Sequence, residues 1–196
     1  MNKTLHLIRH GQAQHNKAFS KFGSKVFYSP KLTDTMLTRE GIQEAKYLNK
    51  TWWDINKIDI VFTSPLYRAC ETTTHIFNNI NIPIYCLEDL REYPIGQQYC
   101  NKRSTLNILK HDFPHIDFTN IKYNEDIYWD KDYAETLDEL NKRIENILCY
   151  LSKIPEQNIA IIGHSSFIGQ LKDNKIRYIE NGDIELKYCY PYRFNL

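Results

Sequence analysis

Residues 4–11 read Thr-Leu-His-Leu-Ile-Arg-His-Gly. Thr4–Ile8 is a short, mainly apolar run that predicts a buried strand, and it ends abruptly at Arg9-His10-Gly11. An arginine and a histidine therefore stand at the carboxyl end of the strand. In open α/β sheets this is the edge at which ligands bind.

Strands and helices alternate along the rest of the chain. Apolar periodicity predicts strands at Ile58–Phe62, Ile82–Leu87 and Asn158–Ile162, and helices after Thr38, at Leu66–Phe77 and at Glu135–Leu151. This alternation predicts an α/β fold, a three-layer sandwich with a mainly parallel central sheet and helices on both faces. We expect an edge strand at Ile184–Tyr188.

The length and composition favour one domain. The chain has 196 residues, of which 42% are hydrophobic, enough for one well-buried core. We therefore predict a single domain over residues 1–196. Residues 88–134 have no clean period, and we interpret them as a lid or specificity segment over the site.

Two further predicted strands end in polar residues. Thr63-Ser64-Pro65 leads to Arg68, and Gly163-His164-Ser165 follows the last strand of the alternating pattern. Because parallel strands end at the same edge, these residues should meet Arg9-His10. Arginine matches phosphate geometry, and a neutral imidazole can attack phosphorus near neutral pH. Glu92, which lies soon after the third strand, is placed to protonate a leaving alkoxide.

These residues carry a family resemblance. Leu7-Ile8-Arg9-His10-Gly11, with Asn16 six positions after the histidine, resembles the signature of the histidine phosphatase superfamily, also called phosphoglycerate mutase-like. Three later motifs are similar to those of the family and occur in the same order: Leu37-Thr38-x-x-Gly41, Thr63-Ser64-Pro65-Leu66-x-Arg68-Ala69-x-x-Thr72 and Gly163-His164. The plant and fungal phosphoglycerate mutase-like proteins are similar also through Leu90-Arg91-Glu92, Cys100-x-Lys102-Arg103-Ser104 and Phe113-Pro114-x-Ile116-Asp117-Phe118.

The resemblance implies a role for each matching residue. His10 would accept the phosphoryl group, and Glu92 would act first as acid and then as base. The clamp on the phosphoryl oxygens would consist of Arg9, Arg68 and His164. Substrate-binding positions would be Asn16, Gln12, Arg91 and Ser165. The implied reaction is metal-independent hydrolysis of a phosphomonoester through a phosphohistidine, with no cofactor.

Two alternatives remain within the same family. Cofactor-dependent phosphoglycerate mutases carry Trp-x-Leu-Asn-Glu-Arg-His-Tyr-Gly around the acid, whereas residues 90–96 here read Leu-Arg-Glu-Tyr-Pro-Ile-Gly. This difference favours a phosphatase over a mutase. The second alternative is an inactive member that binds a phosphorylated ligand, but such a protein would not need His10, Glu92 and His164 together.

Other chemistries fit less well. Gly163-His164-Ser165-Ser166-Phe167 resembles the Gly-x-Ser-x-Gly turn of α/β-hydrolases, but it lacks the second glycine, and no histidine follows His164 in the chain. His111 and His115 are spaced as helical metal ligands, but Pro114 stands between them. We expect His15 in a loop near the pocket mouth.

Composition limits the partners. The 25 Lys and Arg residues nearly balance 24 Asp and Glu, so the net charge of +1 gives no sign of nucleic-acid or membrane binding. The five cysteines are widely spaced and form no Cys-x-x-Cys pair, which suggests reduced thiols and a cytoplasmic location; no signal peptide or membrane segment is recognisable. We expect a small phosphorylated substrate, while the sequence gives no indication of oligomeric state.

Overall fold

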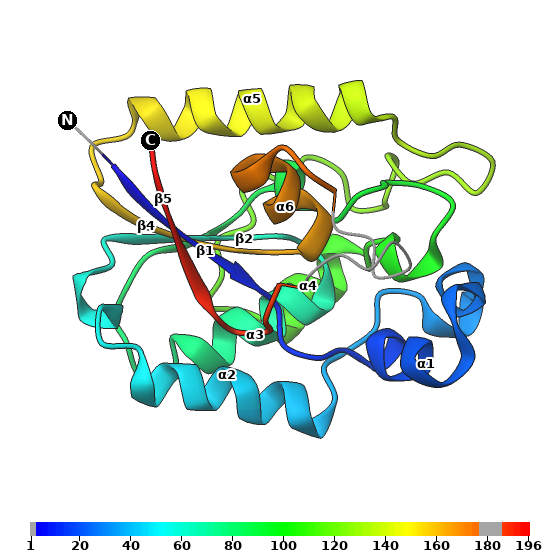
Figure 1. Ribbon diagram of the computed structural model, residues 1–196, viewed down its shortest axis with the longest axis horizontal. Helices are drawn as coiled ribbons and strands as arrows, with labels where there is room; N and C mark the ends of the chain where they lie inside the picture. Colours follow the sequence, from blue (N-terminus) through cyan, green and yellow to red (C-terminus); the bar gives the residue numbers. More distant parts are fainter. Residues whose placement is uncertain (1–2, 177–185) are drawn as a thin grey trace.

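A five-stranded sheet runs through the centre of the protein, whose computed structural model describes residues 3–176 and 186–196 (Figure 1). The strands are β1 (Thr4–Arg9), β2 (Ile60–Thr63), β3 (Ile84–Cys86), β4 (Asn158–Gly163) and β5 (Pro191–Asn195). Their order is β3-β2-β4-β1-β5; the first four are parallel, and β5 is antiparallel to β1. The predicted mainly parallel sheet is confirmed.

Helices cover both faces of this sheet, which confirms the three-layer sandwich (Figure 1). One face carries α2 (Arg39–Thr51), α3 (Tyr67–Ile76) and α4 (Leu106–Asp112), and the other carries α5 (Leu137–Lys153) and α6 (Ser165–Asp173). Helix α1 (Gln14–Phe22) lies beyond the end of β1. Short 3-10 helices occur at η1 (Ser24–Tyr28), η2 (Pro30–Leu32), η3 (Ile55–Lys57), η4 (Glu88–Leu90) and η5 (Tyr99–Asn101).

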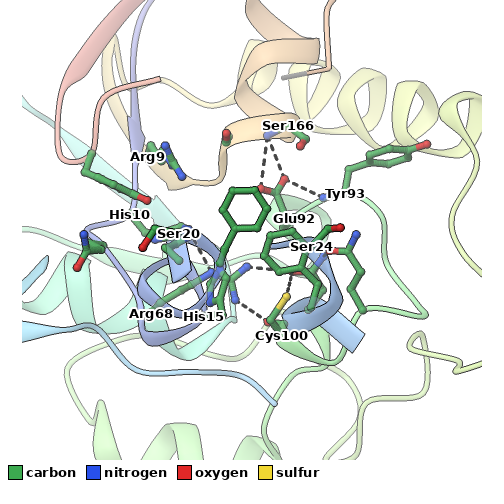
Figure 2. Close-up of a pocket in the computed structure, with 18 of the residues that line it drawn as sticks. Arg9, His10, His15, Ser20, Ser24, Arg68, Glu92, Tyr93, Cys100 and Ser166 are labelled. Carbon is green, nitrogen blue, oxygen red and sulfur yellow. Dashed lines mark hydrogen bonds between the residues drawn. The ribbon is translucent and has the colours of Figure 1, made fainter. Parts of the chain in front are cut away.

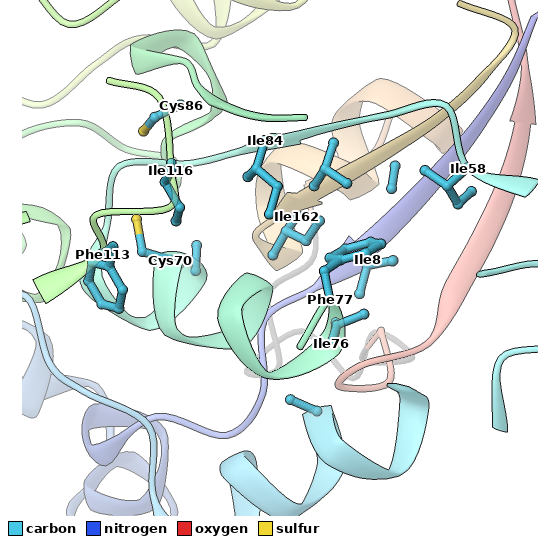
Figure 3. Packing of buried hydrophobic residues seen from close by; sticks show 14 of the residues in the cluster. Ile8, Ile58, Cys70, Ile76, Phe77, Ile84, Cys86, Phe113, Ile116 and Ile162 are labelled. Atoms are coloured by element: carbon cyan, nitrogen blue, oxygen red, sulfur yellow. The ribbon is translucent and has the colours of Figure 1, made fainter. Parts of the chain in front are cut away.

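The apolar strands are apolar on both faces because each face has its own core. Within β1, Leu7 packs toward α5 and α6, whereas the next residue, Ile8, packs toward α2 and α3. Figure 3 shows the core on the α2 and α3 side of the sheet, with Ile8 and Ile162 close to Phe77, the residue that follows α3. Burial on both faces explains why these strands read as continuous apolar runs rather than alternating ones.

Local signals fix where two of the helices begin. Thr38 caps α2, since its side chain accepts a hydrogen bond from the Gly41 N–H. Thr136 and Glu139 form a reciprocal capping box at the start of α5. The predicted helix after Thr38 is confirmed, and α5 begins two residues later than the predicted Glu135.

Two motif glycines allow a close backbone approach. A Cβ added to Gly11 would lie 2.6 Å from the Gly41 carbonyl oxygen, and one added to Gly41 would lie 2.2 Å from the Gln12 carbonyl oxygen. The loop after β1 therefore presses directly against the start of α2. Any side chain at either position would force these two backbones apart.

Two sequence expectations were wrong. The edge strand is β5 at Pro191–Asn195 and not Ile184–Tyr188, of which residues 184–185 lie outside the described residues. Tyr188 instead makes a single bridge to Arg9. Helix α1 spans Gln14–Phe22, so His15, which we expected in a loop, lies in a helix. Polar residues obscured the apolar period of this short helix. Its stability comes from packing against η1 rather than from the helix propensity of its residues.

Of the described residues, no helix combines the length and apolar character needed to cross a membrane. The cysteine side chains are free thiols: Cys70, Cys86, Cys100, Cys149 and Cys189. Within residues 88–134 the structure places η4, η5 and α4, and the interpretation of this segment as a lid of a single domain stays a prediction.

Candidate active site

The carboxyl ends of β1 and β4 bring two histidines together. His10 follows β1 and His164 follows β4, the His10 N–H donates to the Gly163 carbonyl at 3.0 Å, and the two ring centroids are 5.1 Å apart. Arg68 reaches the same place from the first turn of α3. Figure 2 shows Arg9, His10, Arg68 and Glu92 around one pocket. The convergence predicted from the strand ends is therefore present.

The hydrogen bonds of His10 define which of its nitrogens carries the proton. Nδ1 lies 2.7 Å from the Gly11 carbonyl oxygen, which can only accept, so Nδ1 is the protonated nitrogen. Nε2 lies 3.2 Å from Arg68 Nε and accepts its N–H. The lone pair of His10 is therefore on Nε2, beside a fixed positive charge.

Burial keeps this imidazole neutral. His10 is 2% exposed, and its removal from water lowers its pKa well below 6.5, with the charges of Arg68 and Arg9 acting in the same direction. The bond to the Gly11 carbonyl opposes the shift and is the smaller effect. A neutral imidazole with an unprotonated Nε2 is a nucleophile at neutral pH.

Arg68 is held rigidly at the pocket floor. Besides donating to His10, its guanidinium donates from Nη1 to the Cys100 carbonyl at 2.6 Å and from Nη2 to the Asn101 side-chain oxygen at 3.0 Å. Arg68 is 1% exposed. Burial gives its charge a strong effect on anything bound next to His10.

Arg9 supplies a second positive charge. Its Nη1 donates to the Leu186 carbonyl at 2.7 Å, and its guanidinium carbon lies 3.9 Å from the centre of the Tyr188 ring. Arg9 and Tyr188 both line the pocket. The segment before β5 thus fixes the side chain that β1 directs into the site.

Glu92 lies across the pocket, at the start of α6. Its Oε1 accepts the N–H groups of Tyr93 at 2.9 Å, Ser166 at 3.2 Å and Phe167 at 3.2 Å. Burial raises the pKa of this carboxyl, although those N–H groups and the charge of Arg68 act in the opposite direction. A carboxyl with a raised pKa suits a proton donor near neutral pH.

His164 is fully buried behind His10. Its Nε2 lies 2.8 Å from the Ser64 hydroxyl, and its Nδ1 has no hydrogen-bond partner among the described residues. Burial is the largest cause that lowers its pKa well below 6.5, and the positive charge of Arg68 lowers the pKa further. His164 is close to His10 but does not line the pocket wall.

The pocket encloses about 680 Å³ and includes three of the expected substrate-binding residues. Gln12, Asn16 and Ser165 all line it. Asn16 also accepts the Ala13 N–H at the start of α1, and Gln12 accepts the Thr38 hydroxyl. Their positions are compatible with substrate contact, and their roles stay predictions.

Arg91, the fourth of these residues, is placed elsewhere. It is fully buried outside the pocket lining, and its guanidinium donates from Nη1 and Nη2 to both carboxylate oxygens of Asp126, at 2.8 and 2.7 Å. Nη1 also donates to Glu88 at 3.0 Å. We correct its expected role from binding substrate to holding residues 88–126 together, because its charge is already paired.

Loss of this buried pair should destabilise the protein. Arg91→Met should lower the free energy of unfolding by about 3–5 kcal/mol, because it leaves the Asp126 carboxylate buried without its partner. Urea unfolding followed by circular dichroism measures this. Lys142→Met, which removes an exposed partner of Glu145, is the matched control and should cost less than about 1 kcal/mol. Equal losses in both variants would contradict a structural role for Arg91.

Sequence reasoning missed part of the pocket lining. His15 is buried rather than at the mouth, and its Nδ1 lies 2.6 Å from the Thr35 hydroxyl. Phe19, Phe27 and Tyr188 also line the pocket. The only available signal was the three-residue and four-residue spacing of His15, Ala18, Phe19 and Phe22, which fits one helical face.

The buried histidines should make stability depend on pH. The pKa values of His10, His15 and His164 all lie well below 6.5 in the folded protein. Below about pH 6.5 the unfolded chain therefore binds protons that the folded chain excludes, and each histidine lowers the free energy of unfolding by up to about 1.4 kcal/mol per pH unit.

The test is to compare urea unfolding at pH 7.5 and 5.5 in a variant that lacks one of these groups. His15→Gln should reduce the difference between the two pH values by about 1 kcal/mol. Ser152→Ala should leave it unchanged, because Ser152 is exposed and carries no titratable group. Identical pH dependence in wild type and His15→Gln would contradict a neutral, buried His15.

The geometry does not favour the other chemistries. His164 contacts Ser64 rather than Ser165, so it is not placed to activate Ser165. His111 pairs with Asp112, and His115 lies 2.9 Å from the Thr74 hydroxyl. Over residues 3–176 and 186–196, no three His, Cys, Asp or Glu side chains form a group that could hold a metal ion.

Comparison with known sequences gives one family over most of the chain. The sequence model of the histidine phosphatase superfamily (branch 1) matches residues 5–177. Phosphoglycerate mutase-like protein 1 of Arabidopsis thaliana is 28% identical over an alignment 196 positions long, which covers 85% of this chain and 69% of that protein.

Solved structures share the fold. The ecdysone phosphate phosphatase of Bombix mori, solved with tungstate, has a TM-score of 0.66 at 18% identity and covers 97% of this chain and 88% of its own. The phosphoserine phosphatase of Entamoeba histolytica, solved with 3-phosphoglyceric acid, has a TM-score of 0.57 at 19% identity, covering 97% and 94%. At these identities the likeness establishes the fold alone.

Proposed function

This chain belongs to the histidine phosphatase superfamily, and from that premise we propose that it hydrolyses phosphomonoesters through a phosphohistidine on His10. The superfamily members that resemble it are phosphatases and phosphoglycerate mutase-like proteins. The observation that carries the proposal is the state of His10. Its Nδ1 is held by the Gly11 carbonyl, and its unprotonated Nε2 faces Arg68 at 3.2 Å.

In the first step, His10 Nε2 forms a bond to phosphorus while the bond from phosphorus to the leaving oxygen breaks. Glu92 gives its proton to that oxygen, which leaves as a neutral alcohol. In the second step, Glu92 takes a proton from water as the water oxygen attacks phosphorus. The bond to Nε2 then breaks, which releases inorganic phosphate and restores both residues.

The surrounding charges suit this transfer. The phosphoryl transition state needs positioned positive charge more than covalent chemistry, and Arg9 and Arg68 provide two fixed cations next to His10. We assign His164 to a hydrogen bond that supports the bound phosphoryl group. Its Nδ1 is available for this bond, since it is buried without a partner among the described residues. A buried ring nitrogen without a hydrogen-bond partner is costly unless a ligand or a rearrangement supplies one.

A mutase reaction is the second candidate, since the Arabidopsis relative is named for it. A mutase must retain a second phosphate group while the phosphohistidine persists. Of the described residues that line the pocket, Arg9 and Arg68 are the only cations, and both are next to His10. This charge distribution favours hydrolysis over transfer.

The reaction can be tested with a panel of small phosphomonoesters and a mutase assay primed with bisphosphoglycerate. Phosphate release should exceed formation of 2-phosphoglycerate from 3-phosphoglycerate, because the described residues that line the pocket offer no second cationic site to retain the intermediate. A chelator should leave the rate unchanged, and vanadate should inhibit. Net conversion of 3-phosphoglycerate to 2-phosphoglycerate faster than phosphate release would make the mutase reaction the correct one.

A further inference from the structure

One wall of the pocket is aromatic and comes from residues 14–28, outside the segment expected to select the substrate. The rings of Phe19 in α1 and Phe27 in η1 are stacked, with centroids 5.1 Å apart and planes at 6°. The His15 ring meets Phe27 edge-on at 6.1 Å, and His10 lies 6.2 Å from His15. The aromatic wall therefore begins beside the nucleophile and extends outward from it.

The pocket is much larger than a phosphoryl group needs. Its volume of about 680 Å³ is within the range of sites that enclose a whole small molecule. Tyr93 follows Glu92 directly and lines the same space, and Tyr28, 53% exposed, stands at its rim (Figure 2 labels Tyr93). The part of the substrate that leaves with the oxygen would therefore lie in a space lined by aromatic side chains.

The charges near this wall are unsuited to a second anion. The two cations, Arg9 and Arg68, lie beside His10, where the phosphoryl group would bind. The polar residues of α1 and η1 that line the pocket beside this wall include Ser20 and Ser24, which are neutral, and so is Gln98 elsewhere in the lining. Glu92 is the one acidic residue among the described lining residues, and it would repel a carboxylate. A second anionic group would be desolvated without a cationic partner.

We propose that the substrate is the monophosphate of an uncharged alcohol that carries a flat aromatic group. The inference rests on the proposed phosphatase function. The phosphoryl group binds at Arg9 and Arg68, and the aromatic group packs against Phe19 and Phe27. Aromatic stacking and removal of apolar surface from water stabilise this complex. An alcohol without an aromatic group gains neither contribution, and a carboxylate or second phosphate would add an anion at neutral side chains.

The test compares three alkyl phosphates: propyl phosphate, 3-phenylpropyl phosphate and 3-phosphoglycerate. The first two have leaving groups of similar reactivity, so their kcat/KM ratio reports binding of the phenyl group. We expect 3-phenylpropyl phosphate to exceed propyl phosphate by about 10–100-fold, equivalent to about 1.4–2.8 kcal/mol. The kcat/KM for 3-phosphoglycerate should fall below the kcat/KM for propyl phosphate.

Paired variants of helix α1 locate the contact. Phe19→Ala should lower the kcat/KM ratio of 3-phenylpropyl to propyl phosphate at least about fivefold, since it removes half of the stacked pair. Phe22→Ala is the matched control: the same change on the same helix, at a ring that is 53% exposed and outside the pocket lining. Its ratio should equal that of wild type. Phe27→Ala should repeat the effect of Phe19→Ala from the other element.

The outcomes separate this inference from the proposed function. A preference for 3-phosphoglycerate, or a ratio unchanged by both Phe19→Ala and Phe27→Ala in folded protein, would overturn the aromatic-substrate inference while the phosphatase stands. If none of the three esters nor 4-nitrophenyl phosphate releases phosphate, the proposed function fails and the inference fails with it. Circular dichroism spectra of the variants show whether each is folded.

Discussion

His10→Ala should lower kcat by about 10⁴-fold or more, the largest effect expected from any single change in this protein. The substitution removes the unprotonated imidazole nitrogen beside Arg68, the Nε2 that accepts the Arg68 N–H at 3.2 Å. Arg9, Arg68 and Glu92 remain, but without the nucleophile they would act only on direct attack by water. The measurement is phosphate release from an alkyl phosphate and from 4-nitrophenyl phosphate.

His111→Ala is the matched control for this variant. His111 is exposed and pairs with Asp112 at 2.8 Å, outside the residues that line the pocket, so its loss should leave kcat within about twofold of wild type. Wild-type enzyme quenched after reaction with a labelled substrate should carry a label that acid removes and alkali preserves, as expected for a phosphorus–nitrogen bond. Label on serine, or full turnover by His10→Ala, would exclude the phosphohistidine mechanism.

Glu92→Gln should slow hydrolysis of alkyl phosphates by about 10²–10⁴-fold, the usual contribution of a general acid. An aryl phosphate should lose much less, because a phenolate leaves with little help from a proton. The ratio of aryl to alkyl rate constants should therefore rise sharply in the variant. Single-turnover measurements on both esters would show the effect in the step that phosphorylates His10.

The variant is suited to this test because the fold should tolerate it. The amide oxygen of glutamine can still accept the Ser166 and Phe167 N–H groups that Glu92 accepts at the start of α6. Glu145→Gln, at an exposed position of α5, should leave both rate constants unchanged. Equal losses on aryl and alkyl esters in Glu92→Gln would remove this residue from the role of acid.

The sequence predicted the fold well where local and long-range patterns agreed. Parallel strands buried on both faces leave continuous apolar runs, so β1, β2 and β4 were found within two residues of their ends. Thr38 marked the start of α2 because an N-cap depends on one local hydrogen bond. The edge strand was misplaced because β5 is half-exposed, with less apolar burial to shape its sequence.

For the site, the sequence by itself determined which side chains gather at the strand ends. Chain order and strand direction bring Arg9, His10, Arg68 and His164 to one edge, and no coordinates are needed to state this. The superfamily follows from the same motifs, since they are spaced along nearly the whole chain. What the sequence does not contain is the environment of each group.

Only the tertiary structure decided what those side chains face. The unprotonated state and position of His10 Nε2 depend on a carbonyl at Nδ1 and an arginine from α3, and the lowered pKa of His10 depends on burial by many distant residues. Arg91 stands in a motif beside Glu92, yet its guanidinium is paired with the carboxylate of Asp126, 35 residues later, outside the pocket lining. The aromatic wall of Phe19 and Phe27 likewise exists only because α1 folds back on η1. Desolvation, charge pairing and ring stacking depend on distances in space, which a linear pattern of residues does not record.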